Sequence, residues 1–140
     1  MVQDALAEIS TETGARFTEM VFPEQANHYG TLFGGHALSL MGKAAFIAAT
    51  RRARASVVMA RSDKVEFHVP VRVGELIELS AEVVRVGRSS MTVVVDVTSE
   101  GLVSGSRRLA VRGSFEMVAV DAEGQPVAIA NSTPSKECST

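Results

Sequence analysis

The sequence predicts a single α+β domain in which a curved antiparallel sheet of about five strands wraps around one long helix. Three features point to this fold. A long apolar stretch follows a glycine pair, later segments alternate apolar and polar residues, and glycines separate those segments. A chain of 140 residues has the size of one ordinary domain. One sheet around one helix buries both kinds of apolar surface economically.

The long helix is expected at about Gly34 to Arg54. Apolar residues occupy most of its circumference, which is typical of a helix buried against a sheet. The sequence has no Asp or Glu between Gln25 and Ser62, so this helix carries no acid. A cluster of basic residues stands at its C-terminal end: Arg51, Arg52 and Arg54. Cations at that end complement the helix dipole, which is their ordinary role.

A short strand near Arg16 to Phe22 and a loop from Pro23 to Thr31 are expected before the helix. The later strands alternate apolar and polar residues, so each is expected to have one apolar and one polar face. Glycine turns separate them: Gly74, Gly87, Gly101 and Gly105. In the last strand the expected apolar face comprises Leu109, Val111, Phe115 and Met117.

The folded domain is expected to comprise residues 15–127. Residues 1–14 are acidic and weakly helical, and residues 128–140 are rich in Ser, Thr and Pro without periodicity. We expect the first segment to be flexible and the second to be disordered.

The composition excludes several classes of protein. A net charge of -2 argues against a wide basic surface, so no nucleic-acid partner is expected. The single Cys138 cannot form an internal disulfide, and no run near 20 apolar residues occurs. We therefore expect a soluble cytoplasmic protein without a membrane partner. One Cys and three His do not supply a closed zinc site, so no metal is expected.

The most informative stretch runs from Asn27 to His36 and brings two glycines into the first turn of the long helix. The first N–H groups of a helix have no internal partner, and glycine lets a ligand carbonyl approach them closely. Such a site stabilises a developing oxyanion. The alternative is a glycine pair that only allows a tight entry into the helix, and this segment alone favours neither explanation.

A second candidate is the turn from Val86 to Ser90, which places one arginine and two serines between expected strands. A guanidinium, hydroxyls and backbone N–H groups together suit a phosphate. Taken alone, the turn is better explained as a solvated hairpin.

The histidines give a weaker signal. His28 and His36 flank the glycine entry and His68 lies near the end of an expected strand, where each could act as an acid or base. Neither His28 nor His36 has an acidic partner on the helix. Ser39 lacks the sequence context of a nucleophile elbow.

Six short motifs occur in order along the chain: NHYGTLFGG at 27–35, LM at 40–41, DKVEF at 63–67, PVRVGE at 70–75, VGRSS at 86–90 and FEMVAVD at 115–121. Together they closely resemble the hotdog-fold acyl-CoA thioesterases of the bacterial YciA and cytosolic acyl-CoA hydrolase type. The resemblance spans about Phe17 to Pro126, which is nearly the whole expected core.

The resemblance implies a sheet wrapped around a central helix, two subunits joined edge to edge, and active sites between them. Such dimers often assemble into trimers of dimers. The implied partners are acyl-CoA and further copies of this chain, and no cofactor is implied. The resemblance assigns the Gly35 N–H as the oxyanion donor, with Asn27 nearby as an orienting side chain.

The resemblance also implies a set of substrate contacts. Val65 and Phe67 would border the acyl and pantetheine channel, and His36 and Lys64 are expected as further contacts. The turn that matches the coenzyme A phosphate site comprises Gly87, Arg88, Ser89 and Ser90.

One departure from the family pattern affects the chemistry. The family's helix normally carries an Asp after its Met, as general base or nucleophile, whereas here Met41 is followed by Gly42. We therefore expect a thioesterase whose activity is low or absent. The first alternative is a non-catalytic acyl-CoA binding or sensing protein. The second is a hotdog hydratase or dehydratase that uses a His and a carboxylate.

Overall fold

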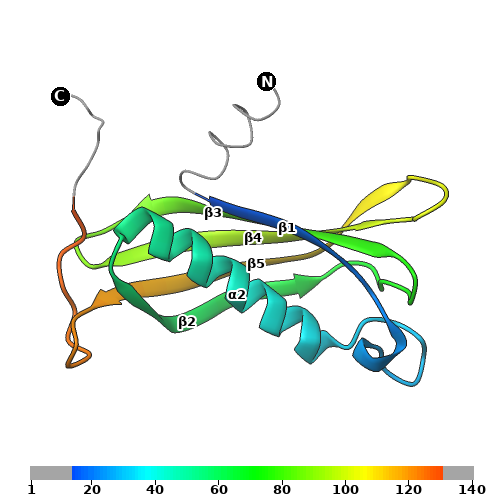
Figure 1. Cartoon of the computed structure of the whole chain (residues 1–140), viewed down its shortest axis with the longest axis horizontal. Coiled ribbons are helices and arrows are strands. Elements are labelled where there is room, and N and C mark those ends of the chain that lie inside the picture. The colour runs from blue at the N-terminus through cyan, green and yellow to red at the C-terminus, as the bar shows by residue number, and fades with distance from the viewer. Residues whose placement is uncertain (1–13, 131–140) are drawn as a thin grey trace.

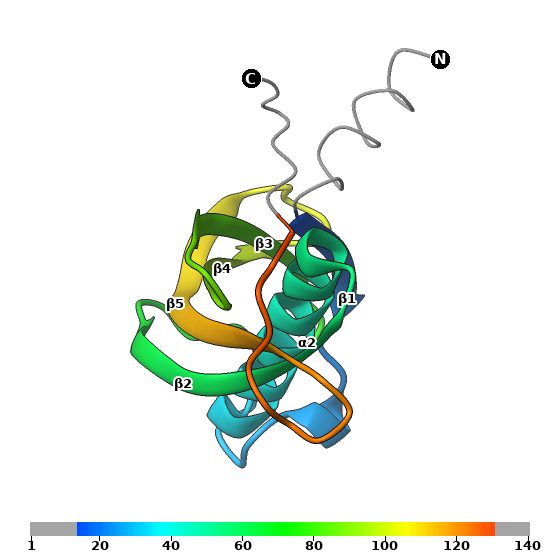
Figure 2. The same cartoon turned by 90° about the vertical axis from the view of Figure 1, so that its left-hand side faces the viewer.

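The computed structural model describes residues 14–130, which form one antiparallel five-stranded sheet around one long helix (Figure 1). The helix is α2 (Gly34–Ala53), and a short 3-10 helix, η1 (Pro23–Gln25), precedes it. The strands are β1 (Gly14–Met20), β2 (Ser56–Phe67), β3 (Leu76–Val86), β4 (Ser90–Glu100) and β5 (Arg107–Val120). Their order is β1-β3-β4-β5-β2, and the sheet curves around α2 (Figure 2). The predicted hotdog fold is confirmed.

The centre of the sheet shows the expected alternation most clearly. On β4, every second residue is buried and the residues between them are half-buried. The buried apolar residues of this strand face α2 and form the middle of the core: Met91, Val93, Val95 and Val97. The alternation arises because successive side chains of a strand point to opposite faces of the sheet.

The last strand departs from the expected pattern at one position. Leu109 is 38% exposed, whereas its neighbour Ala110 is fully buried. The reason is an irregularity in the pairing with β4, where Val97 lies opposite Val111 but Thr98 lies opposite Leu109. An extra residue on one strand reverses the faces beyond it. The expectation that Leu109 belongs to the apolar face was therefore wrong.

α2 is buried against the sheet on one side, although apolar residues occupy most of its circumference. The buried side is rich in alanine, which lets the helix approach the sheet closely: Ala37, Leu40, Met41, Ala44, Ala45, Ala48, Ala49 and Ala53. The other side exposes 40% of Leu38 and 47% of Phe46. Residues 14–130 therefore cover these two residues only in part.

The ends of the domain differ slightly from the expected boundaries. Gly14 belongs to β1. Residues 128–130 lie beside the β3–β4 turn, where the Ile129 N–H donates to the Arg88 carbonyl at 2.8 Å. The expectations for residues 1–13 and 131–140 lie outside the described residues. α2 ends one residue before Arg54, which caps the helix in a left-handed conformation with φ 51°.

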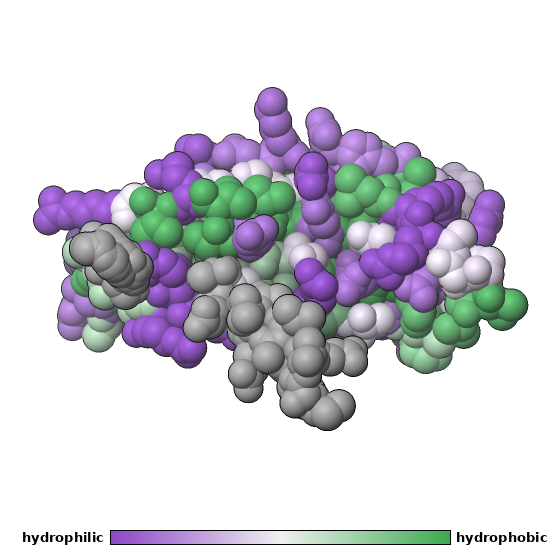
Figure 3. Space-filling model, turned by 90° about the horizontal axis from the view of Figure 1, so that it is seen from above, coloured by the Kyte–Doolittle hydropathy of each residue, from purple (hydrophilic) through white to green (hydrophobic). Residues whose placement is uncertain are grey.

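The outer face of the sheet carries ion pairs between neighbouring strands. Arg112 binds Asp96 through two hydrogen bonds of 2.6 and 2.9 Å, and Arg107 binds both Glu78 and Glu100. These hydrogen bonds to the carboxylates raise the pKa of both guanidinium groups above the usual value, so both stay charged. Seen from above, polar side chains surround separate apolar patches (Figure 3).

The β2 edge is the least covered part of the sheet. Most of its residues are exposed, including 49% of Val58 and 43% of Met59. One side of β2 pairs with β5, and no described strand pairs with the other. An open edge with apolar side chains is suited to pairing with another chain.

Candidate functional site

The loop before α2 is held by Asn27. Its Oδ1 accepts hydrogen bonds from the Tyr29 N–H at 2.9 Å and from the Thr31 N–H and hydroxyl, both at 3.2 Å. The Asn27 N–H donates to the Thr31 carbonyl at 2.8 Å, and the Leu32 N–H donates to the Val71 carbonyl at 2.7 Å. Because the oxygen of Asn27 is used within the loop, its amide nitrogen is the part that can face a ligand.

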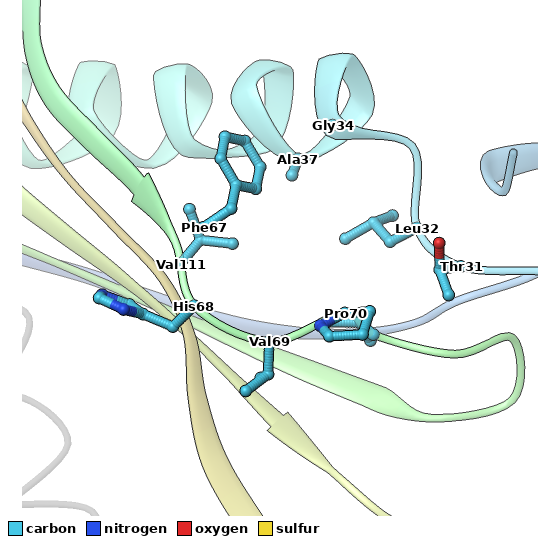
Figure 4. Close-up of a pocket in the computed structure, with 10 residues that line it drawn as sticks. Thr31, Leu32, Gly34, Ala37, Phe67, His68, Val69, Pro70 and Val111 are labelled. Atoms are coloured by element: carbon cyan, nitrogen blue, oxygen red, sulfur yellow. The ribbon is translucent and has the colours of Figure 1, made fainter.

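A cavity of about 280 Å³ lies between this loop, the first turns of α2 and the end of β2 (Figure 4). The ring of Phe67 points toward α2, and its edge would lie 3.7 Å from a Cβ on Gly34. The lining is largely apolar and includes no acidic residue, lysine or arginine: Thr31, Leu32, Gly34, Ala37, Phe67, His68, Val69, Pro70, Val71 and Val111. This chemistry suits an acyl chain.

Gly34, the first residue of α2, lines this cavity, whereas Gly35 does not. The N–H of His36 donates to the Phe33 carbonyl at 3.0 Å. The N–H groups of Gly34 and Gly35 donate to no residue in the described range 14–130. A Cβ on Gly35 would lie 2.7 Å from the Phe33 ring, so a side chain there would displace that ring. The space of a Gly35 side chain is thus filled by the Phe33 ring. The free N–H donors are what can bind a carbonyl oxygen.

Position 42 lies on the same face of α2 as Gly35 but farther along the axis. Seven residues of helix separate them by about 10 Å, at 1.5 Å per residue. The nearest neighbour of a Cβ on Gly42 would be the Met59 methyl at 3.4 Å. Within one subunit, a side chain at position 42 is therefore too far from the Gly35 N–H for both to meet one carbonyl group.

The other residues expected on this side of the site are dispersed. Val65 packs into the core beside Gly113, where a Cβ on that glycine would lie 3.0 Å from the Val65 methyl. Lys64 is exposed on a bulge of β2 with φ 45°. His36 is half-buried, its Nε2 is buried without a hydrogen-bond partner, and it does not line the apolar cavity. None of these three residues lines the apolar cavity.

His68 lines the cavity, but its ring points away from Thr31 and Leu32 (Figure 4). Its Nε2 lies 3.8 Å from a carboxylate oxygen of the exposed Glu66.

The β3–β4 turn lines a second cavity of about 350 Å³ at the C-terminal end of α2. Gly87 and Arg88 belong to its lining, whereas Ser89 and Ser90 do not. A Cβ on Gly87 would lie 3.0 Å from the Ser90 hydroxyl, which explains the glycine. The remaining lining residues were not expected from the sequence: Arg52, Val86, Ala128, Ile129 and Ala130.

Several residues of the apolar cavity were also missed. Ala37 follows Gly34 by three residues, so helical spacing could have placed both on one side. Val111 reaches the cavity only through the pairing of β5 with β2, for which no local sequence signal exists.

No helix in the described part of the chain is long and apolar enough to cross a bilayer. Residues 14–130 also contain no group of three or more His, Cys, Asp or Glu side chains placed to hold a metal ion.

Comparison with known proteins places these features in a family. Residues 29–106 match the model of the thioesterase superfamily. The chain is 38% identical over 120 residues to the uncharacterized acyl-CoA thioester hydrolase YkhA of Bacillus subtilis, covering 86% of this chain and 70% of that protein.

Solved structures agree. An acyl-CoA hydrolase from Staphylococcus aureus, in complex with butyryl coenzyme A, coenzyme A and coenzyme A disulfide, superimposes with a TM-score of 0.81 at 33% identity, covering 86% of this chain and 73% of that one. The hexameric thioesterase y2039 from Yersinia pestis superimposes with a TM-score of 0.78 at 33% identity, covering 84% and 96%.

Proposed function

Because the chain belongs to the thioesterase superfamily, we propose that it hydrolyses acyl-CoA thioesters to free carboxylic acids and coenzyme A. The observation that carries this proposal is the apolar cavity beside the unpaired N–H groups of the α2 start. The cavity suits the acyl chain, and the N–H groups suit the thioester carbonyl. The named activity of relatives such as the B. subtilis and S. aureus proteins supports the same substrate class.

In the proposed reaction, water attacks the thioester carbon and the carbonyl oxygen becomes an oxyanion that accepts a hydrogen bond from the Gly35 N–H. Collapse of the tetrahedral intermediate breaks the carbon–sulfur bond and expels coenzyme A as the thiolate. The thiolate takes up one of the two protons of the attacking water, the other is released to solvent, and the acid leaves as the carboxylate. The reaction needs no redox cofactor, because hydrolysis changes no oxidation state. The Asn27 amide nitrogen is proposed to orient the carbonyl.

No carboxylate on α2 can activate the attacking water. Gly42 stands where the family pattern has an Asp, and a glycine supplies no proton acceptor. The proposed activity is therefore low unless another group activates the water. The same residue favours a second candidate function, a non-catalytic acyl-CoA binding or sensing protein.

The active site is proposed to be shared between two subunits. Gly35 and position 42 lie about 10 Å apart along α2 in one subunit, so a carbonyl contacts both only if they come from different subunits. The open β2 edge and the exposed Leu38 and Phe46 provide the surface for this pairing. Assembly of dimers into a trimer of dimers is proposed in line with the hexameric Y. pestis relative. A cytoplasmic location is part of the same proposal.

The direct test measures release of free thiol from a panel of acyl-CoAs, together with binding of coenzyme A by calorimetry. Thiol release at enzyme-like rates supports the hydrolase. Tight binding without thiol release supports the sensing protein. A change in double-bond absorbance on hydroxyacyl-CoA, without thiol release, would instead indicate a hydratase or dehydratase. Absence of both binding and turnover would reject the proposal.

The shared site requires at least a dimer. Sedimentation at micromolar concentration is expected to show a dimer or larger assembly. A stable monomer of 14.9 kDa would contradict the shared site and the assignment of residues across it.

A further inference from the structure

Arg52 is a basic residue that the proposed reaction does not use. It stands in the last turn of α2, where it would ordinarily be assigned only to the helix dipole. The structure instead places it in the lining of the 350 Å³ cavity, together with Arg88 from the β3–β4 turn. Two arginines from distant parts of the sequence therefore line one cavity.

Neither guanidinium is neutralised by a neighbouring acid. Within residues 14–130, no carboxylate lies within ion-pair distance of Arg52 or Arg88. The outer face of the sheet provides the contrast, because Arg107 and Arg112 there are each bound to carboxylates. The cavity itself is lined by no acidic residue. Two arginines that line one cavity and have no carboxylate partner favour an anionic ligand.

A segment after β5 holds this arrangement in place. The Ile129 N–H donates to the Arg88 carbonyl at 2.8 Å, and Arg52 Nη1 donates to the Ala130 carbonyl at 3.2 Å. Figure 1 shows the segment running past the end of the sheet where α2 ends. One nitrogen of Arg52 is thereby anchored, while its remaining N–H groups can face a ligand.

We infer that Arg52 is a second phosphate-binding residue, which acts with Arg88 on the phosphate-bearing end of the substrate, and that residues 128–130 form a wall of this site. The inference rests on the proposed function for the identity of the ligand. The cavity lies about 27 Å along α2 from Gly34, at 1.5 Å per residue. It is therefore distinct from the apolar cavity, although both serve the same class of ligand.

The test compares binding of coenzyme A, dephospho-coenzyme A and pantetheine to the wild-type protein and to Arg52→Ala. Loss of one charge-assisted contact is expected to weaken coenzyme A binding about 10- to 100-fold. Pantetheine, which has no phosphate, is expected to bind equally to both. An effect that vanishes with dephospho-coenzyme A assigns Arg52 to the 3′-phosphate. One that persists there assigns it to the diphosphate.

Matched variants separate binding from mere positioning. Arg52→Lys keeps the charge and is expected to recover part of the affinity, whereas Arg52→Gln keeps a donor without charge and is expected to bind as weakly as Arg52→Ala. The control is Arg108→Ala, which removes an exposed arginine at the opposite end of β5. It is expected to change nothing.

Hydrogen exchange at the Ile129 amide reports whether the segment stays in place in each variant. Weaker coenzyme A binding with an unchanged exchange rate supports direct contact. Faster exchange, with Arg52→Gln as tight as the wild type, would overturn the inference in favour of a positioning role. Unchanged coenzyme A affinity in Arg52→Ala would also overturn it and would leave the hydrolase proposal standing, because thiol release tests that proposal separately.

Discussion

The two ends of α2 differ in chemistry. At the N-terminal end, a cavity of about 280 Å³ is largely apolar and lies beside unpaired backbone N–H groups. At the C-terminal end, a cavity of about 350 Å³ is lined by Arg52 and Arg88. The same helix thus borders a site suited to an acyl chain and a site suited to phosphate.

The difference teaches that the domain is suited to a ligand whose two ends have opposite character. An acyl thioester of coenzyme A has an apolar tail, a reactive carbonyl and a charged nucleotide. About 27 Å of helix separates the two sites within one subunit, so under the proposed pairing of subunits a single ligand would meet sites from two subunits. Gly42 lies between them, where no reactive side chain is present.

The largest effect is expected from Gly42→Asp, which supplies a carboxylate between the two sites. The nearest obstacle to a side chain is the flexible Met59 methyl at 3.4 Å, so the variant is expected to fold. Thiol release should rise about 10²- to 10⁴-fold, the usual effect of a positioned general base. Coenzyme A binding should change far less. The rate should increase with pH as the carboxyl group ionises, because only the ionised form accepts a proton.

Gly42→Asn is the matched control, because it has nearly the same shape without a proton-accepting charge. It is expected to leave thiol release at the wild-type rate. If Gly42→Asp folds, binds acyl-CoA and is no faster than the Asn variant, position 42 is not the vacant catalytic position. Asn27, His28 and Glu66 would then be the groups to test for water activation.

The sequence predicted the fold well because the fold depends on periodic patterns. Alternation on β4 and the apolar window of α2 are local signals, and both elements form close to where they were expected. The prediction was wrong where pairing between strands decides the outcome. Leu109 turns outward because of an irregularity opposite β4, and no pattern within β5 itself indicates it.

The candidate site could be predicted only where its residues follow one another in the chain. The glycine pair at the start of α2 and the turn containing Arg88 are contiguous motifs, and the family resemblance suggested their roles. Arg52 was explained by the helix dipole because its neighbour across the cavity is far away in sequence. Whether Val65, Lys64 and His36 contact substrate stays a prediction.

Arg88→Ala tests the cavity at the C-terminal end of α2, which Arg88 lines. Removing this guanidinium should weaken coenzyme A and acyl-CoA binding by roughly 1 to 3 kcal/mol, the scale of a charge-assisted hydrogen bond. The loss should shrink for a truncated pantetheine thioester. Calorimetry with both ligands measures it. Equal affinity in wild type and variant would return Arg88 to the role of a turn residue.

Phe67→Ala tests the apolar cavity at the N-terminal end of α2. The ring is 54% exposed in the single subunit and borders the cavity near Gly34. Its loss should cost about 1 kcal/mol of acyl-chain burial, or roughly a fivefold rise in KM for long-chain acyl-CoAs. Free coenzyme A, which has no acyl chain, should be weakened less. A variant that weakened free coenzyme A to the same degree would show that the two ends are not chemically separate.

The smallest effect is expected from Gly42→Ala, which tests the helix between the two sites without adding chemistry. Glycine in a helix interior costs about 1 kcal/mol relative to alanine, so the variant should be more stable by roughly that amount. Gly42 does not have a positive φ, and a Cβ there meets only the Met59 methyl at 3.4 Å. Urea unfolding at a fixed subunit concentration measures the change, because assembly also contributes to apparent stability. Thiol release should stay at the wild-type rate. A less stable variant would mean that the space beside Met59 is already filled in the assembled protein, and the Asp variant would then fail for steric reasons rather than chemical ones.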